Sequence, residues 1–350
     1  MTALTVPARP TEDPSLRPVP WRRMAWVTWR QHRAALAGLA VFLGAVAVMM
    51  WLLGLQVHHA YAAAIACHPQ ESAACSSLGL AFDREYVVIF NGYPLIAVPA
   101  LVGAFAGAPV LSRELETGTF RYAWTQSFGR WRWTLAKLVT LSVAVSAGAG
   151  ALTVLFCWYY QPYLATRTGD LGLNEVSPLT QLFVLRGVAF AAWTLAAFAI
   201  GALAGMLIRR VVPAIAATLA VWTGLLVAAG LYLREHYLTP LVSINRLPPT
   251  SAWILGQQWT KGGQLVSQSA INQVFQEAQT RLGQGANGLG IPGQGGPVQQ
   301  YVIQHGYTLQ TIYQPGSRFW PLQWIEGGWL LALTVVLIAV TVWLVRRRAA

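Results

Sequence analysis

Six long apolar runs without a charged side chain constrain this fold more than any other feature of the sequence. A helix needs about 20 apolar residues to cross roughly 30 Å of hydrocarbon. The runs that meet this length cover residues 34–57, 86–112, 138–166, 187–208, 211–233 and 327–345. A further charge-free stretch at 282–317 is rejected as a span, because its Gly and Gln residues would place unpaired amides in lipid. The pattern predicts an all-α polytopic membrane protein with six transmembrane helices.

The composition agrees with a chain that is surrounded by a lipid bilayer. The sequence is 55% hydrophobic and only 10% charged, whereas soluble domains are about 25% charged. A net charge of +12 often accompanies nucleic-acid binding. Here, however, the charges lie between apolar runs, so they indicate membrane topology and no nucleic-acid partner.

The distribution of Lys and Arg predicts the orientation of the spans. If the N-terminus is cytoplasmic, the inner segments hold sixteen of the 24 basic residues but only four of the 12 acidic ones. The inner side then carries the whole net charge, as the positive-inside rule requires. Both termini are therefore expected in the cytoplasm.

These spans divide the chain into five parts. The polar, proline-rich start is expected to be a disordered cytoplasmic tail and not a signal peptide. The Trp- and Arg-rich segment that follows is either a distinct interfacial helix or a basic flank of the first span. The parts are the tail at 1–20, the interfacial helix at 21–33, spans one to five at 34–233 with a cytoplasmic loop at 113–137, an external insert at 234–326, and span six with a basic tail at 327–350.

The insert is expected to be a small external cap and not an enzyme domain. Ile271, Val274, Phe275, Ala278 and Leu282 recur at helical spacing, which predicts one amphipathic helix. The Gly- and Gln-rich stretch 283–296 is expected to be a flexible loop. The apolar face of the helix would pack on the outer ends of the spans or on a partner subunit.

Two features near the second span leave alternatives open. Cys67 and Cys75 lie in the first outer segment, where they form either a small disulfide loop or two free thiols. Pro94 and Pro99 kink the second span, so this helix either lines a pathway or is an ordinary kinked helix.

One pair of charges marks the outer entrance of the last span. Glu326 stands at its mouth, and Arg318 lies shortly before it. The two are expected to form an exposed interfacial ion pair that contributes little, or else an outer gate on an exit path.

The sequence lacks the motifs of the common catalytic sites. It contains no phosphate-binding loop that ends in Gly-Lys-Ser or Gly-Lys-Thr, no His-Glu-x-x-His helix and no Gly-x-Ser-x-Gly turn. We therefore expect no enzyme activity, no metal and no cofactor. The spans also hold almost no ionisable group, which disfavours an ion-coupled carrier. Energy would then come from a partner on the inner face, and the cargo would be apolar or amphipathic.

The inner loop between spans two and three carries the most specific pattern. It reads Arg-Glu-Leu-Glu-Thr-Gly-Thr from residue 113. This loop resembles the signature of ABC type-2 exporter permeases, and the matching residues are Arg113, Glu114, Glu116, Gly118, Thr119, Gly129, Arg130 and Lys137. Ser127 and Phe128 stand where that family often has a proline. The six spans and the long segment before the last one are also similar to this family, in particular to permeases of high-GC Gram-positive bacteria.

The resemblance implies a permease subunit of an ATP-driven exporter in a bacterial plasma membrane. A separate ABC ATPase would bind ATP and dock on the inner loop, where the coupling residues would be Arg113, Glu114, Glu116, Gly118, Thr119 and Arg130. A second permease, identical or related, would complete a dimer. Alternatively, the loop is a solvated turn that binds no partner. The alternative function is a membrane-anchored enzyme or assembly factor that acts through the insert.

Overall fold

The computed structural model describes residues 20–69, 72–90, 93–118, 130–167, 181–246, 248, 252–282 and 297–348. Among these residues, six helices are long and apolar enough to cross a membrane, which confirms the six-span prediction. They cover Trp21–Ala66, Leu95–Thr117, Arg130–Pro162, Ala189–Ile208, Val211–His236 and Gly316–Arg347. The predicted tail at 1–20 lies outside the described residues, except for Pro20.

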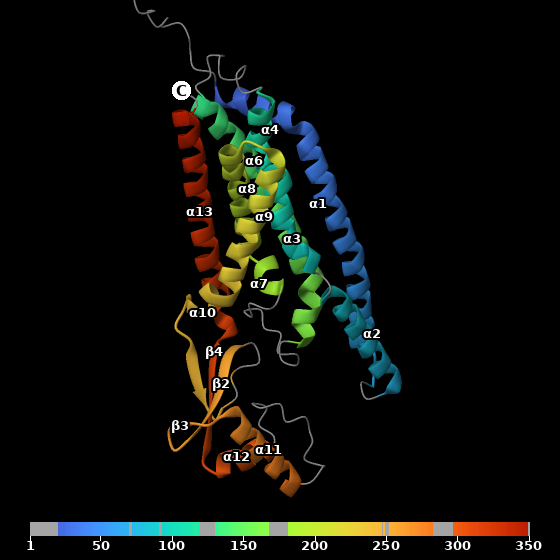
Figure 1. Ribbon diagram of the computed structural model, residues 1–350. Helices are drawn as coiled ribbons and strands as arrows, with labels where there is room; N and C mark the ends of the chain where they lie inside the picture. The colour runs from blue at the N-terminus through green and yellow to red at the C-terminus, as the bar shows by residue number, and fades with distance from the viewer. Residues whose placement is uncertain are drawn as a thin grey trace, which may run out of the picture.

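The helices stand side by side in one bundle (Figure 1). The helical elements are α1 (Trp21–Ala66), α2 (Ala73–Phe90), α3 (Tyr93–Val102), the π-helical turn η1 (Gly103–Gly107), α4 (Pro109–Thr117), α6 (Arg130–Arg167), α7 (Gln181–Leu185), α8 (Ala189–Ile208), α9 (Val211–Ala228), η2 (Ala229–Leu233), α10 (Arg234–His236) and α13 (Phe319–Arg348). We call the end that holds the start of α1 and the end of α13 the basic end. The opposite end, from which the insert projects, is the insert end.

The first helix is much longer than a membrane requires. Its 46 residues correspond to about 69 Å of helix, more than twice the thickness of the hydrocarbon. The structure has no break between 21–33 and the span that follows, so the predicted interfacial segment is the first part of α1. Figure 1 shows these first turns lying across the basic end before the helix runs along the bundle.

The second span begins at Leu95 rather than at residue 86, and it is built from three pieces. Pro94 lies in the first turn of α3, and Pro99 lies inside that helix. Residues 86–90 belong to α2, and α3 begins at Tyr93, while residues 91 and 92 lie outside the described residues. A proline suits the first turn of a helix, because the N–H that it lacks has no partner there. The π-helical turn η1 follows Pro99 and leads into α4.

Helix α8 occupies the centre of the bundle, and the side chains of Trp193 and Phe198 on it are fully buried. Gly201 and Gly205 lie against the backbone of η1 and α4, and a Cβ atom added at Gly201 would overlap the carbonyl oxygen of Gly103. Small residues at such contacts allow membrane helices to approach closely. The second and fourth spans are therefore packed backbone against backbone.

The insert contains an antiparallel sheet that the sequence patterns did not predict. Its strands are β1 (Leu241–Ile244), β2 (Trp253–Lys261), β3 (Gln264–Leu265) and β4 (Tyr307–Gln314), in the order β1-β4-β2-β3. The predicted amphipathic helix is confirmed as α11 (Gln268–Leu282), and a short α12 (Pro297–Gln304) follows. Trp259, Ile271, Val302 and Leu309 form a core between these helices and the sheet. The predicted loop at 283–296 lies outside the described residues.

At the insert end, the connection from α1 to α2 contains a disulfide. The structure joins Cys67 to Cys75, with their Cα atoms 5.6 Å apart. The bridge lies next to the C-terminus of α1 and therefore closes a short loop between two helices.

The tight contact at Gly201 gives a stability prediction. Gly201→Ala should lower the free energy of unfolding by about 1–3 kcal/mol, because the new methyl group meets backbone that cannot move aside. Gly224→Ala on α9 is the matched control, since the Cβ would enter open space there. Melting temperatures of the two variants in detergent check this. Equal melting temperatures would contradict the packing described here.

Candidate functional sites at the two ends of the bundle

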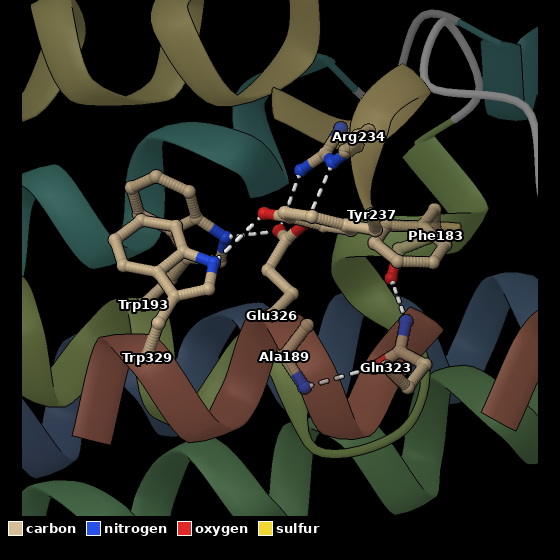
Figure 2. A network of polar contacts seen from close by, with 8 residues as sticks. All are labelled: Phe183, Ala189, Trp193, Arg234, Tyr237, Gln323, Glu326 and Trp329. Carbon is tan, nitrogen blue, oxygen red and sulfur yellow. Dashed lines mark hydrogen bonds and ion pairs between the residues drawn. The ribbon is translucent and has the colours of Figure 1, made fainter. Parts of the chain in front are cut away.

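The insert end holds a buried carboxylate with strong hydrogen-bond donors. Glu326 on α13 is 0% exposed. Its Oε2 accepts a hydrogen bond from Nε of Arg234 and its Oε1 accepts one from Nη2 of Arg234, both at 2.7 Å. Nε1 of Trp193 donates a third bond to Oε1 at 2.7 Å. Figure 2 shows Arg234 and Trp193 pointing at this carboxylate from two different helices. The arrangement is a bidentate, charge-assisted pair, which is the strongest class of protein hydrogen bond.

Aromatic side chains complete the shell around this ion pair. The hydroxyl of Tyr237 lies 3.4 Å from Oε2 of Glu326 and accepts a hydrogen bond from Nε1 of Trp329 at 2.7 Å. Burial, followed by the nearby charge of Glu326, raises the pKa of the Tyr237 phenol, so it remains protonated and can donate. The guanidinium of Arg234 also lies 4.8 Å from the centre of the Phe183 ring. Aromatic surface therefore shields the pair from water.

Gln323, about one turn before Glu326 on α13, makes a second connection between helices. Its Oε1 accepts a hydrogen bond from the backbone N–H of Ala189 at 3.0 Å, and its Nε2 donates to the carbonyl of Phe183 at 2.5 Å. The N–H groups in the first turn of a helix have no partner within that helix. Gln323 supplies one for α8 and fixes α13 against α7 and α8 (Figure 2).

The predicted pairing of Arg318 with Glu326 is wrong. Nη1 of Arg318 donates instead to the carbonyl of Thr239 and to Oε1 of Gln314, both at 2.7 Å. Arg318 ends the 3-10 turn before α13, and the eight residues to Glu326 span about 12 Å of helix. The partner of Glu326 is Arg234 on α10. Arg234 directly follows the fifth apolar run and Glu326 directly precedes the sixth, so the sequence already placed both charges at the same side of the membrane. That was the available sequence signal for the pair.

The basic end holds a second ion pair at the end of α4, in which the lysine is buried and the carboxylate is partly exposed. Oε1 of Glu114 lies 2.6 Å from Nζ of Lys137 and accepts a bond from Nε2 of Gln31 at 2.7 Å. Nζ of Lys137, which is 0% exposed, also donates to the carbonyl of Val110 at 2.9 Å. One carboxylate thus connects α1, α4 and α6. The sequence pattern suggested that Glu114 would be available to a partner, but tertiary packing brings Lys137 and Gln31 to it instead.

Glu116 makes a contact with the helix that follows the fourth span. Its Oε2 accepts a hydrogen bond from the backbone N–H of Val211 at 3.1 Å, and Val211 begins α9. A carboxylate is favourable there because a helix N-terminus carries partial positive charge. Beyond Glu116, α4 ends at Thr117 and is followed by the capping residue Gly118, whose φ of 72° lies in the left-handed region that glycine tolerates.

The other predicted coupling residues lie around these contacts. Arg113 is exposed on α4, and Arg130 begins α6. Thr119 lies outside the described residues. The inner loop is thus represented in the structure by its two flanks, α4 and the start of α6.

Six spans with a charged cluster at each end define a polytopic membrane protein. A family model described as ABC-2 membrane transporter related matches residues 40–234, which is more than half of the chain. The chain therefore belongs to this family and is a transporter permease subunit. Neither a curated protein nor a solved structure matches it. The matched region ends at Arg234 and leaves the insert and α13 outside.

The ion pair at the insert end predicts an asymmetric response to mutation. Glu326→Gln should cost about 3–5 kcal/mol of stability, because it leaves the guanidinium of Arg234 buried without a counter-charge. The double change Arg234→Met with Glu326→Leu should restore part of this loss. Arg318→Gln is the control and should cost far less. Chemical unfolding in detergent measures all three, and equal losses for the two Gln variants would contradict the assigned pairing.

Proposed function

We propose that this permease subunit belongs to an ATP-driven exporter and that a separate ABC ATPase docks at its basic end and binds the ATP. The observation that carries the proposal is the bonding of Glu114 and Glu116. These two carboxylates at the end of α4 contact α1, α6 and α9. A force applied to the inner loop would therefore reach three membrane helices directly.

The strength of these contacts favours rigid transmission of movement from the inner loop to the membrane helices. Separating Lys137 from Glu114 would leave a buried ammonium group without a counter-charge, at a cost of several kcal/mol. The end of α4 would thus move together with α6 rather than independently of it. This property suits a coupling element, which must convert the closure of an ATPase into rocking of the helices.

The proposed orientation places the basic end in the cytoplasm of a bacterial cell. Exposed guanidiniums lie over tryptophan rings at this end, with Arg30 5.4 Å from the ring centre of Trp26 and Arg347 4.7 Å from that of Trp343. Indoles suit the headgroup region, and arginines attract the anionic lipids of a cytoplasmic leaflet. These features support the cytoplasmic orientation of the basic end that the distribution of Lys and Arg predicts.

An apolar or amphipathic substrate is the proposed cargo, carried between two permease copies that are identical or related. The buried charges Lys137, Arg234 and Glu326 are all paired, so none of them is free to carry ions along a pathway. Arg234 with Glu326 is the proposed closure of the insert end, and Pro99 with η1 is the proposed point of flexibility in the second span. Movement of the helices would have to open the insert end for release.

The charge of Glu116 provides the test of coupling. The tagged full-length chain is purified from its native membranes, and co-purification of an ABC ATPase and ATP hydrolysis by the complex are measured. Glu116→Arg should abolish association or lower hydrolysis by about tenfold or more, within the range of coupling energies between sites. Glu116→Gln, which keeps an acceptor for Val211, separates the loss of charge from the loss of the contact with α9.

Glu277→Arg is the matched control for the coupling test. Glu277 is an exposed carboxylate on α11 of the insert, where it pairs with Arg281 one turn away. This variant should keep both association and hydrolysis. If Glu116→Arg behaves like Glu277→Arg, Glu116 has no role in coupling, and failure to recover any ABC ATPase with the wild-type chain would reject the exporter itself.

A further inference from the structure

An apolar groove opens between α1 and the second span. Ala35, Gly38 and Phe42 form one side, and Val102, Phe105 and Ala106 form the other. The cavity has a volume of about 420 Å³, which falls within the range of small-molecule and cofactor sites. Phe105 is 64% exposed at its edge.

Local backbone features create this groove. A Cβ atom at Gly38 would meet open space, so α1 presents a notch there rather than a side chain. On the facing helix, η1 covers Gly103–Gly107, and a π-helical turn holds more residues than an α-helical one and widens the helix. Such π-helical bulges occur often at functional sites.

The position of the groove within the membrane determines which molecules can enter it. Both walls belong to membrane spans, Trp21–Ala66 and Leu95–Thr117, so hydrocarbon is the medium that reaches them. The next polar groups lie toward the basic end. His32 precedes Ala35 by about one helical turn, and Arg113 follows Ala106 by two turns, so both continue the faces that form the groove.

The exposed charge at this end of the groove suits an anion. Arg113 is exposed on α4, and among the residues that the structure describes it has no ion-pair partner. The neighbouring carboxylates are engaged elsewhere, since Glu114 pairs with Lys137 and Glu116 accepts a hydrogen bond from the N–H of Val211. Nε2 of His32 is covered by protein, so Arg113 is the group that a ligand can reach.

We propose that the groove binds one acyl chain of an anionic phospholipid from the leaflet next to the basic end, with Arg113 facing its headgroup. The phosphate complements the guanidinium and can accept hydrogen bonds from it. A second copy of this chain is the competing occupant. Symmetric contact through this face would set the Arg113 guanidiniums of the two copies at the same depth with no anion between them, whereas a phospholipid supplies that anion. The site is independent of the ATPase.

Photolabelling of the full chain in nanodiscs tests the site. The probes are phosphatidylglycerol and phosphatidylcholine, each with a diazirine in the middle of one acyl chain, and labelled peptides are mapped by mass spectrometry. Label should concentrate on 35–42 and 101–106. Phosphatidylglycerol should label these segments about fivefold more than phosphatidylcholine, which corresponds to ~1 kcal/mol for one Arg at the membrane surface.

Two pairs of variants separate binding of the acyl chain from recognition of the headgroup. Gly38→Trp should fill the groove and remove the label from 101–106, whereas Gly44→Trp, on the same helix and also facing open space, should not. Arg113→Gln should remove the preference for phosphatidylglycerol and leave labelling by the chain. Arg30→Gln is its control, because Arg30 lies over Trp26.

Three results would overturn the lipid site. The exposed residues Val335 and Val336 on α13 could label as strongly as the groove, which would indicate ordinary contact with bulk lipid. Gly38→Trp could leave the label at 101–106 unchanged. A disulfide between two Phe105→Cys chains would show that a second copy fills the groove. None of these outcomes depends on ATPase association, so failure here leaves the proposed exporter function standing.

Discussion

The contact of Gly201 and Gly205 on α8 with η1 and α4 is the constraint on which the bundle depends. In a bilayer, lipid chains are as apolar as the side chains they contact, so close van der Waals packing replaces the hydrophobic effect as the force between helices. Helix α8 also packs against α6, α9 and α13, and α1 joins the bundle through α6. The positions of the other spans therefore follow from this central helix.

Charge pairs hold the two ends of this bundle. Burying a single charge is expensive, and a buried pair offsets the cost only with good geometry and additional hydrogen bonds. Glu326 meets this condition through Arg234 and Trp193, and Glu114 meets it through Lys137 and Gln31. Both pairs join segments far apart in sequence, so they specify which helices meet at each end. In the middle of the bundle, α8 and the second span are held by close packing of their backbones.

The family match divides both charged clusters. At the basic end, Glu114 and Lys137 lie inside the matched region and Gln31 lies outside it. At the insert end, Arg234 is the last matched residue, and Glu326 and the insert lie outside. The insert end carries a compact sheet and helices whose base is closed by the pair of Arg234 and Glu326.

The sequence by itself determined the number of spans, their class and the helix at 268–282, because apolar length and helical spacing are local properties that the bilayer makes decisive. It could not reveal the partner of Glu326, because Arg234 and Arg318 are both plausible until the helices are placed beside each other. The short strands of the insert escaped detection since their pairing is non-local and their residues include many Gln and Thr. The groove beside Gly38 was also invisible, because a cavity is a property of two packed surfaces. Tertiary structure decided which charges pair and where space remains.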